Sequence, residues 1–349
     1  MMWQKRAGPC EWMTNLRPNL LQHIGPTCER ALVCASIRGS GRCGPFEFAL
    51  AFKSRAVAEA IEPLFPTTSG GNHDLTIAFL SRRDLDLTGL IPEPADISHA
   101  LMTSGGYYAA WRPDERPVLY LLDKQARRGL VWFAADVPPN WELSRPALPL
   151  INMLSVDTTW TLAHGGAVGK DGRFLLFAGR GRSGKSTAAL ACARTGWDYA
   201  GDDYIITEPE KCRVEPLYTS ARLRIDVVDA FSDLVARTSS GITTDKGDSR
   251  HELRLGAQFK DQIRGGTIAA ILLPRRQGSP VPTFAPARKC DAFAALMSVA
   301  GTLLPWSRQV LVARLADLVG CAPTFFVDTG SNPALLPDEF GRLLGGLRP

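Results

Sequence analysis

The sequence lacks the features of a membrane-spanning or nucleic-acid-binding protein. No apolar run among its 349 residues approaches the roughly 18 residues that a transmembrane helix needs. The 40 basic and 35 acidic residues leave a formal net charge of only +5, which is too weak and too evenly spread to favour nucleic acid. We therefore expect neither a membrane nor a nucleic acid among its partners.

Cysteine pairs with metal-binding spacing are also missing. No two cysteines form a C-x-x-C motif, and His23 is the only histidine near the first four, so the spacing does not favour a zinc site. The N-terminus has positive charge but no apolar core and no small-residue cleavage site, unlike a secretory signal. We expect a cytoplasmic protein whose thiols are reduced. The cysteines are Cys10, Cys28, Cys34, Cys43, Cys192, Cys212, Cys290 and Cys321.

The N-terminal part of the chain changes character near Phe46. The composition, 45% apolar and 21% charged, is typical of a globular protein, and the length allows about two domains. Residues 1–44 show no sustained periodicity, so we expect a poorly ordered lead-in, with Met13 as an alternative start. FEFALAFK predicts a strand, SRAVAEAIEPLF a short amphipathic helix, and DLTIAFL, YYAAWR, PVLYLL and GLVWFAAD further strands. Residues 45–145 are thus predicted to form a small α+β domain.

Residues 146–349 alternate between strand and helix patterns. RPALPLINMLSVDTTW predicts a bridging helix, followed by strands at WTLAHGGAVG and GRFLLFAG, a helix at GKSTAALACARTG and a strand at DYAGDDYIITE. This alternation favours a parallel or mixed sheet flanked by helices, an α/β domain. We predict further helices around 290–303, 307–319 and 333–345, and a strand at TFFVDTG.

A glycine-rich segment, GRGRSGKST, lies between the strand at GRFLLFAG and the following helix. It satisfies G-x-x-x-x-G-K-[ST] in full. Glycines allow a tight turn whose amide groups point inward, and the helix adds its positive N-terminus, so the loop suits a polyphosphate. The competing interpretation is a chance glycine-rich turn. The predicted phosphate-binding residues are Gly179, Arg180, Gly181, Arg182, Ser183, Gly184, Lys185, Ser186 and Thr187.

Two side chains of this loop have expected roles in binding a nucleoside triphosphate. Lys185 can reach the β- and γ-phosphates, and we expect it to face solvent while the loop is empty. The Ser186 hydroxyl can ligate the magnesium ion that bridges those phosphates.

An adjacent carboxylate pair, Asp202 and Asp203, follows the predicted helix. A return strand would bring the pair to the sheet edge beside the loop. One carboxylate can complete a magnesium shell and the other can accept a proton. The competing interpretation is a solvated strand end or a cap. His164, in the predicted strand WTLAHGGAVG that precedes the strand leading into the loop, either orients a carboxylate, contacts the γ-phosphate or is structural.

These three features together resemble the kinase domain of HPr kinase/phosphorylase and its wider family. The resemblance covers residues 155–210 well and continues weakly towards 340. It implies a P-loop fold with a mixed sheet of the HPr kinase and phosphoenolpyruvate carboxykinase type. The N-terminal region does not resemble the first domain of the bacterial HPr kinase. It is more similar to divergent HPr-kinase-like proteins of biosynthetic gene clusters, some of which phosphorylate a peptide.

The resemblance also implies roles for individual residues. Lys185 and Ser186 would bind ATP and Mg²⁺, Asp202 would be the base on the acceptor serine, Asp203 would help hold the metal, and His164 would lie in the active site. The family's downstream metal-binding glutamate and its phosphorolysis segment are not found, which leaves reversal of the kinase open.

Several basic and aromatic residues downstream have two interpretations each. Lys246, Arg250 and Arg254 either stabilise the transferring phosphoryl group or belong to a solvated loop. Tyr218 and Arg222 are candidates for the acceptor side.

The sequence therefore predicts a kinase that transfers the γ-phosphate of ATP to a hydroxyl. The acceptor would be a serine-bearing protein or peptide, or a small hydroxylated metabolite, selected by residues 45–145. One alternative is a nucleotide-operated binding module that transfers no phosphate to an acceptor. Another is a carboxykinase-like enzyme, whose extra metal ligands and cationic pocket are not evident. The choice between ATP and GTP and a homo-oligomeric state are left open.

Overall fold

The structure is a computed structural model of the chain, and it describes residues 20–68, 73–90, 100–112, 116–245, 248–275, 277–300 and 308–347. The chain divides into two compact units. The first comprises Met1–Gly39, Phe48–Glu59 and His73–Pro139. The second comprises Ser40–Glu47, Ala60–Asn72 and Asn140–Pro349.

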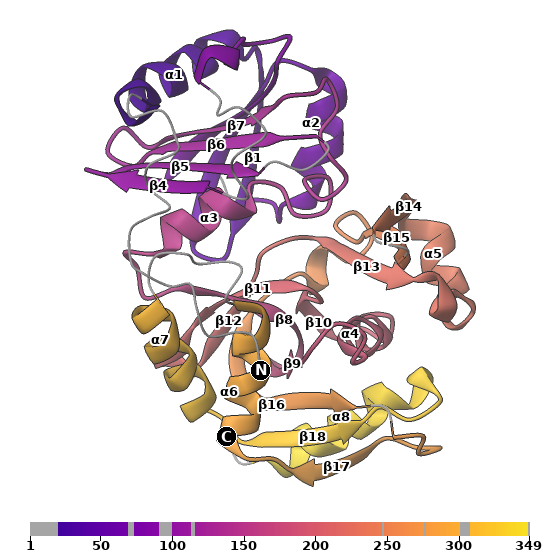
Figure 1. Ribbon diagram of the computed structural model, residues 1–349. Coiled ribbons are helices and arrows are strands. Elements are labelled where there is room, and N and C mark those ends of the chain that lie inside the picture. Colours follow the sequence, from indigo (N-terminus) through magenta and orange to yellow (C-terminus); the bar gives the residue numbers. More distant parts are fainter. Residues whose placement is uncertain are drawn as a thin grey trace, which may run out of the picture. The chain divides into compact units, whose positions relative to one another are not determined.

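The N-terminal sheet has, within the described residues, seven strands in the order β1-β2-β3-β7-β6-β5-β4. Figure 1 shows β7, β6, β5 and β4 side by side in this sheet. Strands β2, β3 and β7 are parallel to one another, and β7, β6, β5 and β4 form an antiparallel meander. The strands predicted from the alternating apolar patterns are confirmed, as is the short helix α2 (Arg55–Ile61). The strands are β1 (Ile37–Cys43), β2 (Phe46–Phe52), β3 (Leu75–Ser81), β4 (Ala100–Ser104), β5 (Tyr107–Arg112), β6 (Val118–Asp123) and β7 (Arg128–Phe133).

A helix that the sequence analysis missed packs on this sheet. The expected lead-in is wrong from Leu20 onward, because α1 (Leu20–Cys34) and β1 are regular elements. Leu20, Ile24 and Cys28 recur every four residues on one face and are buried in a core with strand residues such as Trp132. Pro26 inside the helix obscured this period, since proline normally interrupts a helix. Met13 lies outside the described residues.

The second unit contains a mixed sheet, which confirms the mixed α/β prediction. β9, β16 and β18 run parallel, whereas β8, β11, β12 and β17 pair antiparallel. The pairings β8–β9–β16–β12–β11–β8 close on themselves. Its described strands are β8 (Thr161–Lys170), β9 (Arg173–Ala178), β10 (Asp198–Gly201), β11 (Tyr204–Glu208), β12 (Arg213–Pro216), β16 (Gly266–Arg275), β17 (Thr283–Pro286) and β18 (Thr324–Asp328).

Helices cover both faces of this mixed sheet, which explains the nearly continuous apolar sequence of β9. Leu175 and Phe177 share a core with residues of α4 and α8. Phe174 and Leu176, which alternate with them, share the other core with residues of α6 and α7. The predicted helices are confirmed as α3 (Leu148–Ser155), α4 (Lys185–Ala193), α6 (Lys289–Ala300), α7 (Arg308–Gly320) and α8 (Leu336–Gly346).

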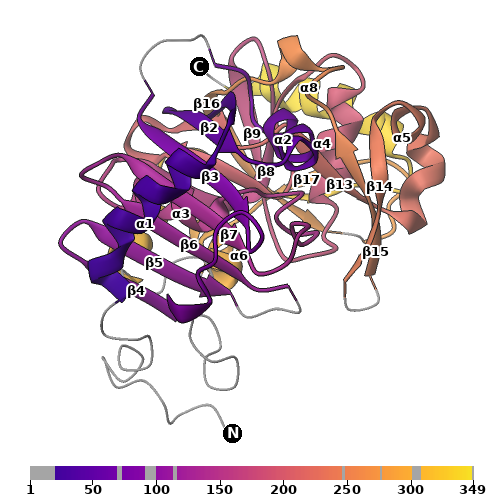
Figure 2. The same ribbon diagram turned by 90° about the horizontal axis from the view of Figure 1, so that it is seen from above.

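A smaller antiparallel sheet follows, with the order β13-β15-β14 (Figure 2). It consists of β13 (Ser220–Arg224), β14 (Ser239–Asp245) and β15 (Asp248–Arg254), and α5 (Ser232–Thr238) precedes β14. Leu223 and Leu253 join the core that contains α4. This packing brings β13 beside the helix that follows the glycine-rich loop.

The cysteines differ from the sequence expectation at one pair. Cys212 and Cys321 form a disulfide, so the prediction of reduced thiols is wrong for them. The bridge was not foreseeable from spacing, because 109 positions separate the two cysteines and the fold brings their Cα atoms to 5.6 Å. The remaining described cysteines are free. Within the described part of the chain, no helix is long and apolar enough to cross a membrane.

Candidate functional site

The glycine-rich loop joins the end of β9 to the start of α4, as the sequence predicted. Gly184 precedes the first helical residue and has a φ of 106°, a left-handed conformation that glycine adopts without strain. Arg182 also has a positive φ, of 67°. Loops that visit this conformation between helical residues turn successive amide groups to one side and form anion-binding concavities.

Lys185 is buried rather than exposed, which corrects the expectation of a solvent-facing lysine. Its side chain folds back over the loop, and Nζ donates to the carbonyls of Gly179 at 2.7 Å and Arg180 at 3.1 Å. Burial lowers the pKa of Lys185, and the charges of Asp203 and Asp202 oppose that effect. The two loop carbonyls satisfy the buried ammonium group, as buried polar groups require.

The aspartate pair lies at a break between two strands. The segment DYAGDDYIITE was predicted as one strand, but β10 ends at Gly201 and β11 begins at Tyr204. The bend comes close to β8, where a Cβ on Gly166 would approach the Gly201 carbonyl oxygen to 2.9 Å. Glycine at 166 therefore makes room for the bend that carries Asp202 and Asp203.

Asp202 is almost completely buried, at 4% exposure. Its Oδ1 accepts from the Tyr199 hydroxyl at 3.1 Å, and its Oδ2 accepts from the backbone N–H of Arg222 at 3.2 Å. Burial, followed by the charge of Asp203, raises the pKa of Asp202 to about 6, although hydrogen bonds from Ser186, Arg222 and Tyr199 act in the opposite direction. A carboxyl group with this pKa can exchange a proton near neutral pH.

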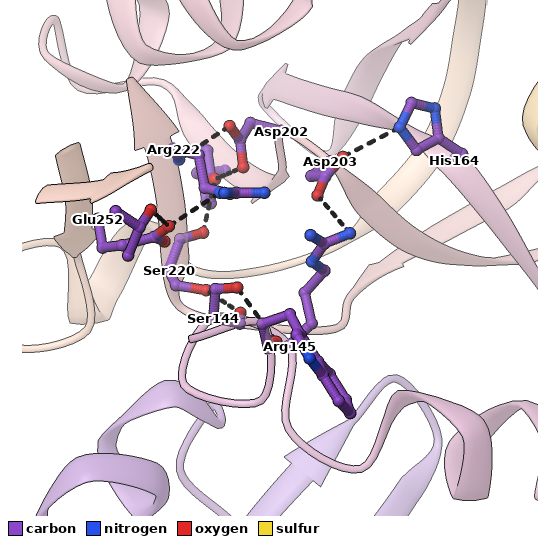
Figure 3. A network of polar contacts seen from close by, with 11 residues as sticks. Ser144, Arg145, His164, Asp202, Asp203, Ser220, Arg222 and Glu252 are labelled. Carbon is purple, nitrogen blue, oxygen red and sulfur yellow. Dashed lines mark hydrogen bonds and ion pairs between the residues drawn. The ribbon is translucent and has the colours of Figure 1, made fainter. Parts of the chain in front are cut away.

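Asp203 has cationic and hydrogen-bonding partners instead (Figure 3). Its Oδ2 lies 3.2 Å from Nη1 of Arg145, and its Oδ1 lies 3.0 Å from Nε2 of His164. Burial alone would raise the pKa of Asp203, but Arg145, His164 and Arg222 together hold it well below its usual range. Asp203 therefore keeps its negative charge at neutral pH.

His164 lies on β8, which pairs with both β9 and β11, so its strand is adjacent to the strand that leads into the loop. Its ring meets the Tyr204 ring edge to face, with 5.2 Å between the centroids. Of the alternatives that the sequence left open, the geometry agrees with orientation of a carboxylate, through the contact with Asp203.

Arg145 was missed by the sequence analysis, because a single arginine at the start of a predicted helix carries no recognisable pattern. The backbone on either side of it is anchored by two hydroxyl groups. Ser220 Oγ donates to the Ser144 carbonyl, and the Tyr218 hydroxyl donates to the Pro146 carbonyl, each at 2.9 Å. These bonds direct Arg145 towards Asp203, and its guanidinium also lies 5.2 Å from the centre of the Tyr204 ring.

A cavity of about 320 Å³ brings most of the predicted site residues together. This volume lies within the range of small-molecule sites. Arg224 and Asp226, which the sequence analysis did not single out, also line it. The lining residues include Gly181–Thr187, His164, Asp202, Asp203, Arg222, Arg224, Asp226 and Arg250.

Several candidate residues do not line this cavity. Gly179 and Arg180 are outside its lining, and their carbonyls accept from Lys185. Tyr218 is buried and bonded to Pro146. Arg254 donates to the carbonyl of Ala60 at 3.3 Å. Lys246 lies outside the described residues.

The oxygen donors at the site fit a magnesium ion held jointly with a phosphate. The described residues contain no cluster of three or more His, Cys, Asp or Glu side chains placed to hold a metal ion. Mg²⁺ commonly takes only one or two carboxylates from the protein and completes its shell with water and substrate phosphates. The Ser186 hydroxyl and a carboxylate of the aspartate pair are donors of this kind.

The comparisons with known proteins show a weak likeness to solved structures. No family model matches the chain, and no curated protein matches it. Among solved structures, the HPr(Ser) kinase/phosphatase from Coxiella burnetii is similar at 14% sequence identity, with a TM-score of 0.26. The likeness covers 52% of this chain and 97% of that one.

Proposed function

We propose that this protein is an ATP- and Mg²⁺-dependent kinase that transfers the γ-phosphate to a hydroxyl group. The acceptor would be a serine of a protein or peptide, or a small hydroxylated metabolite. One observation carries the proposal. The loop with Lys185 and Ser186 lines the same cavity as two adjacent carboxylates whose pKa values the protein moves in opposite directions.

The loop would bind the triphosphate through its amide groups and the N-terminus of α4. Lys185 would exchange its bonds to the loop carbonyls for bonds to phosphate oxygens, which are stronger because both partners are charged. Ser186 and Asp203 would hold Mg²⁺, and the bound ion would supply positive charge to the β- and γ-phosphate oxygens. His164 and Arg145 keep the Asp203 carboxylate ionised and fixed in orientation.

Asp202 would act as the base. At neutral pH a carboxyl group with a pKa near 6 is mostly ionised, yet it is basic enough to take a proton from a hydroxyl during transfer. The acceptor oxygen forms a bond to the γ-phosphorus while the bond from that phosphorus to the bridging oxygen breaks and ADP leaves. The acceptor's proton moves to a carboxylate oxygen of Asp202.

The proposal is tested with purified protein, Mg²⁺ and ATP labelled in the γ-phosphate. The acceptors are a serine-containing peptide library and a set of hydroxylated metabolites, and the matched variant is Asp202→Asn. We expect label on an acceptor with the native protein and a loss of about 10²–10⁴ in rate with the variant. ATP binding with label appearing only as free phosphate would favour the nucleotide-operated module. Absence of ATP binding would overturn the nucleotide site itself.

A further inference from the structure

Arg222 is a positively charged residue that lines the cavity. It lies on β13 directly opposite Glu252 of β15, and its Nε donates to Glu252 Oε1 at 2.9 Å. The same oxygen accepts from Thr243 Oγ1 of β14 at 2.6 Å. The side chains of Arg222 and Glu252 are 15% and 12% exposed. Figure 3 shows these two side chains joined by the hydrogen bond from Nε to Oε1. Residues from all three strands of the small sheet therefore hold the guanidinium group of Arg222 in place.

The backbone of Arg222 is also tied to the candidate base. Its N–H donates to Oδ2 of Asp202 at 3.2 Å. The guanidinium group therefore cannot shift relative to Asp202 without breaking either this bond or the bond to Glu252. A group that must act beside the reacting hydroxyl requires this kind of fixed relation to the base.

Most of the guanidinium remains available to a ligand. Only Nε of Arg222 is engaged by Glu252, and the two Nη groups bind no other part of the chain that the structure describes. Arginine presents paired N–H groups that match the oxygens of a phosphate. Arg222 lines the cavity, so these groups can reach a bound anion.

Arg182 and Arg250 also line the cavity. Three further basic side chains near the site are held differently from Arg222. Arg224 is paired with Asp226 at 2.9 Å. Arg145 does not line the large cavity, and its guanidinium binds Asp203. Lys185 belongs to the loop. Arg222 lines the cavity, and its Nη groups are left for a ligand. Its backbone N–H also donates a hydrogen bond to Asp202.

We propose that Arg222 binds the phosphoryl group during its transfer and stabilises the charge that develops on its oxygens. This inference rests on the proposed kinase function. Arg222 would complement Lys185, which would bind the phosphates from the loop. Glu252 is a positioning residue, since it fixes the guanidinium through Nε and leaves the Nη groups for the phosphate.

The test compares the binding of MgADP with that of MgADP plus aluminium fluoride, a mimic of the transferring phosphoryl group that requires no acceptor. We expect the native protein to bind the fluoride complex at least about 100-fold more tightly than MgADP. Arg222→Met should remove most of this gain, on the scale of about 10²–10³ for one charge-stabilising donor, and leave the Kd for MgADP within about threefold. Arg222→Lys should restore part of the gain, because it keeps the charge without the paired N–H groups.

Two further variants make the result specific. Arg237→Met, on the exposed side of α5, removes an arginine outside the cavity and should leave both affinities unchanged. Glu252→Gln should weaken only the fluoride complex, by about tenfold, because the guanidinium loses its charged anchor. Circular dichroism and thermal melting check folding. If Arg222→Met does not fold, Arg222→Lys and Glu252→Gln decide the question.

The outcomes separate the two proposals. Retention of the full gain by Arg222→Met would overturn the role of Arg222 while leaving the kinase proposal intact. Equal affinity of the native protein for MgADP with and without aluminium fluoride would also count against Arg222 as a ligand of the phosphoryl group. Failure of the native protein to bind MgADP or MgATP would instead overturn the proposed function.

Discussion

Asp202 and Asp203 are neighbours in the chain, but the protein surrounds their carboxyl groups with opposite partners. Asp202 is buried among neutral donors, which include the Tyr199 hydroxyl and a backbone amide. Asp203 lies against the Arg145 guanidinium and the His164 ring. Pairs of titratable groups whose environments separate their pKa values are typical of sites that need one fixed charge and one exchangeable proton.

The rate of phosphoryl transfer should decrease in acid with a midpoint near pH 6. Asp202 must be ionised to accept a proton, and burial beside Asp203 raises its pKa to about 6. Below that value the rate should fall about tenfold per pH unit. The measurement is kcat/KM between pH 5 and 8, with Asp202→Asn as the control that should lose this dependence. A native profile that stays level down to pH 5 would exclude Asp202 as the base.

Asp202→Asn should make the folded protein more stable at pH 7.5. The folded-state pKa of Asp202 is raised from 3.8 to about 6, so folding binds a proton in this range and native stability falls as pH rises from about 4 to 6. A shift of this size corresponds to about 3 kcal/mol. We expect the free energy of unfolding at pH 7.5 to increase by about 1–3 kcal/mol. The increase falls below the full value of about 3 kcal/mol because the amide nitrogen of asparagine, itself a donor, must face the surrounding hydrogen-bond donors.

Urea unfolding at pH 7.5 and pH 4 measures this effect. The advantage of the Asp202→Asn variant should shrink at the lower pH, where the native carboxyl group is also neutral. A variant that is less stable than the native protein at pH 7.5 would mean that its hydrogen bonds outweigh the cost of burying the charge.

Asp203→Asn should impair phosphoryl transfer in a different way from Asp202→Asn. The variant leaves the partly buried Arg145 guanidinium without its carboxylate partner, which should lower the stability of the folded protein. If Asp203 also holds the metal, half-maximal transfer will need more Mg²⁺, and excess Mg²⁺ will restore part of the rate. Transfer is measured against Mg²⁺ concentration for both variants. Identical responses of the two would mean that the carboxylates act as one metal site, and the assignment of Asp202 as base would be withdrawn.

Lys185→Met should abolish most of the affinity for ATP while the protein remains folded. Methionine retains an apolar stem of similar length but cannot replace the charged bond to the phosphates. We expect the Kd to rise by about 10²-fold, measured by calorimetry in the presence of Mg²⁺. The Gly179 and Arg180 carbonyls lose their partner in this variant, so a small decrease in melting temperature is also expected. Unchanged ATP binding would rule out the phosphate-binding loop.

Helix α1 should be essential to the stability of the first unit. Ile24 is completely buried in the core beneath the helix, and Ile24→Ala should cost about 2–5 kcal/mol. Val33 on the same helix is 81% exposed, so Val33→Ala is a matched control that should change stability by less than about 0.5 kcal/mol. Chemical unfolding of both variants provides the comparison. Equal effects would show that α1 does not contribute to this core.

Much of the fold was predictable from local pattern. Alternating apolar residues identified the strands of the first sheet from β2 onward, except β4. The short apolar run before Gly179 identified β9. Both patterns are local properties of the chain, so they can be recognised without the fold. Helix α1 was missed because Pro26 disguised its period. The disulfide was missed because 109 positions separate its cysteines.

The glycine-rich loop with its lysine and hydroxyl, and the adjacent carboxylates, could be recognised from the chain, since each depends on residues close together in it. The difference between the two carboxylates depends on the fold. Arg145 reaches Asp203 from a segment before α3, and Arg222 and Glu252 meet across two strands of the small sheet. Burial and charge act through space, so the pKa of Asp202 and the orientation of Arg222 depend on contacts that no local spacing records.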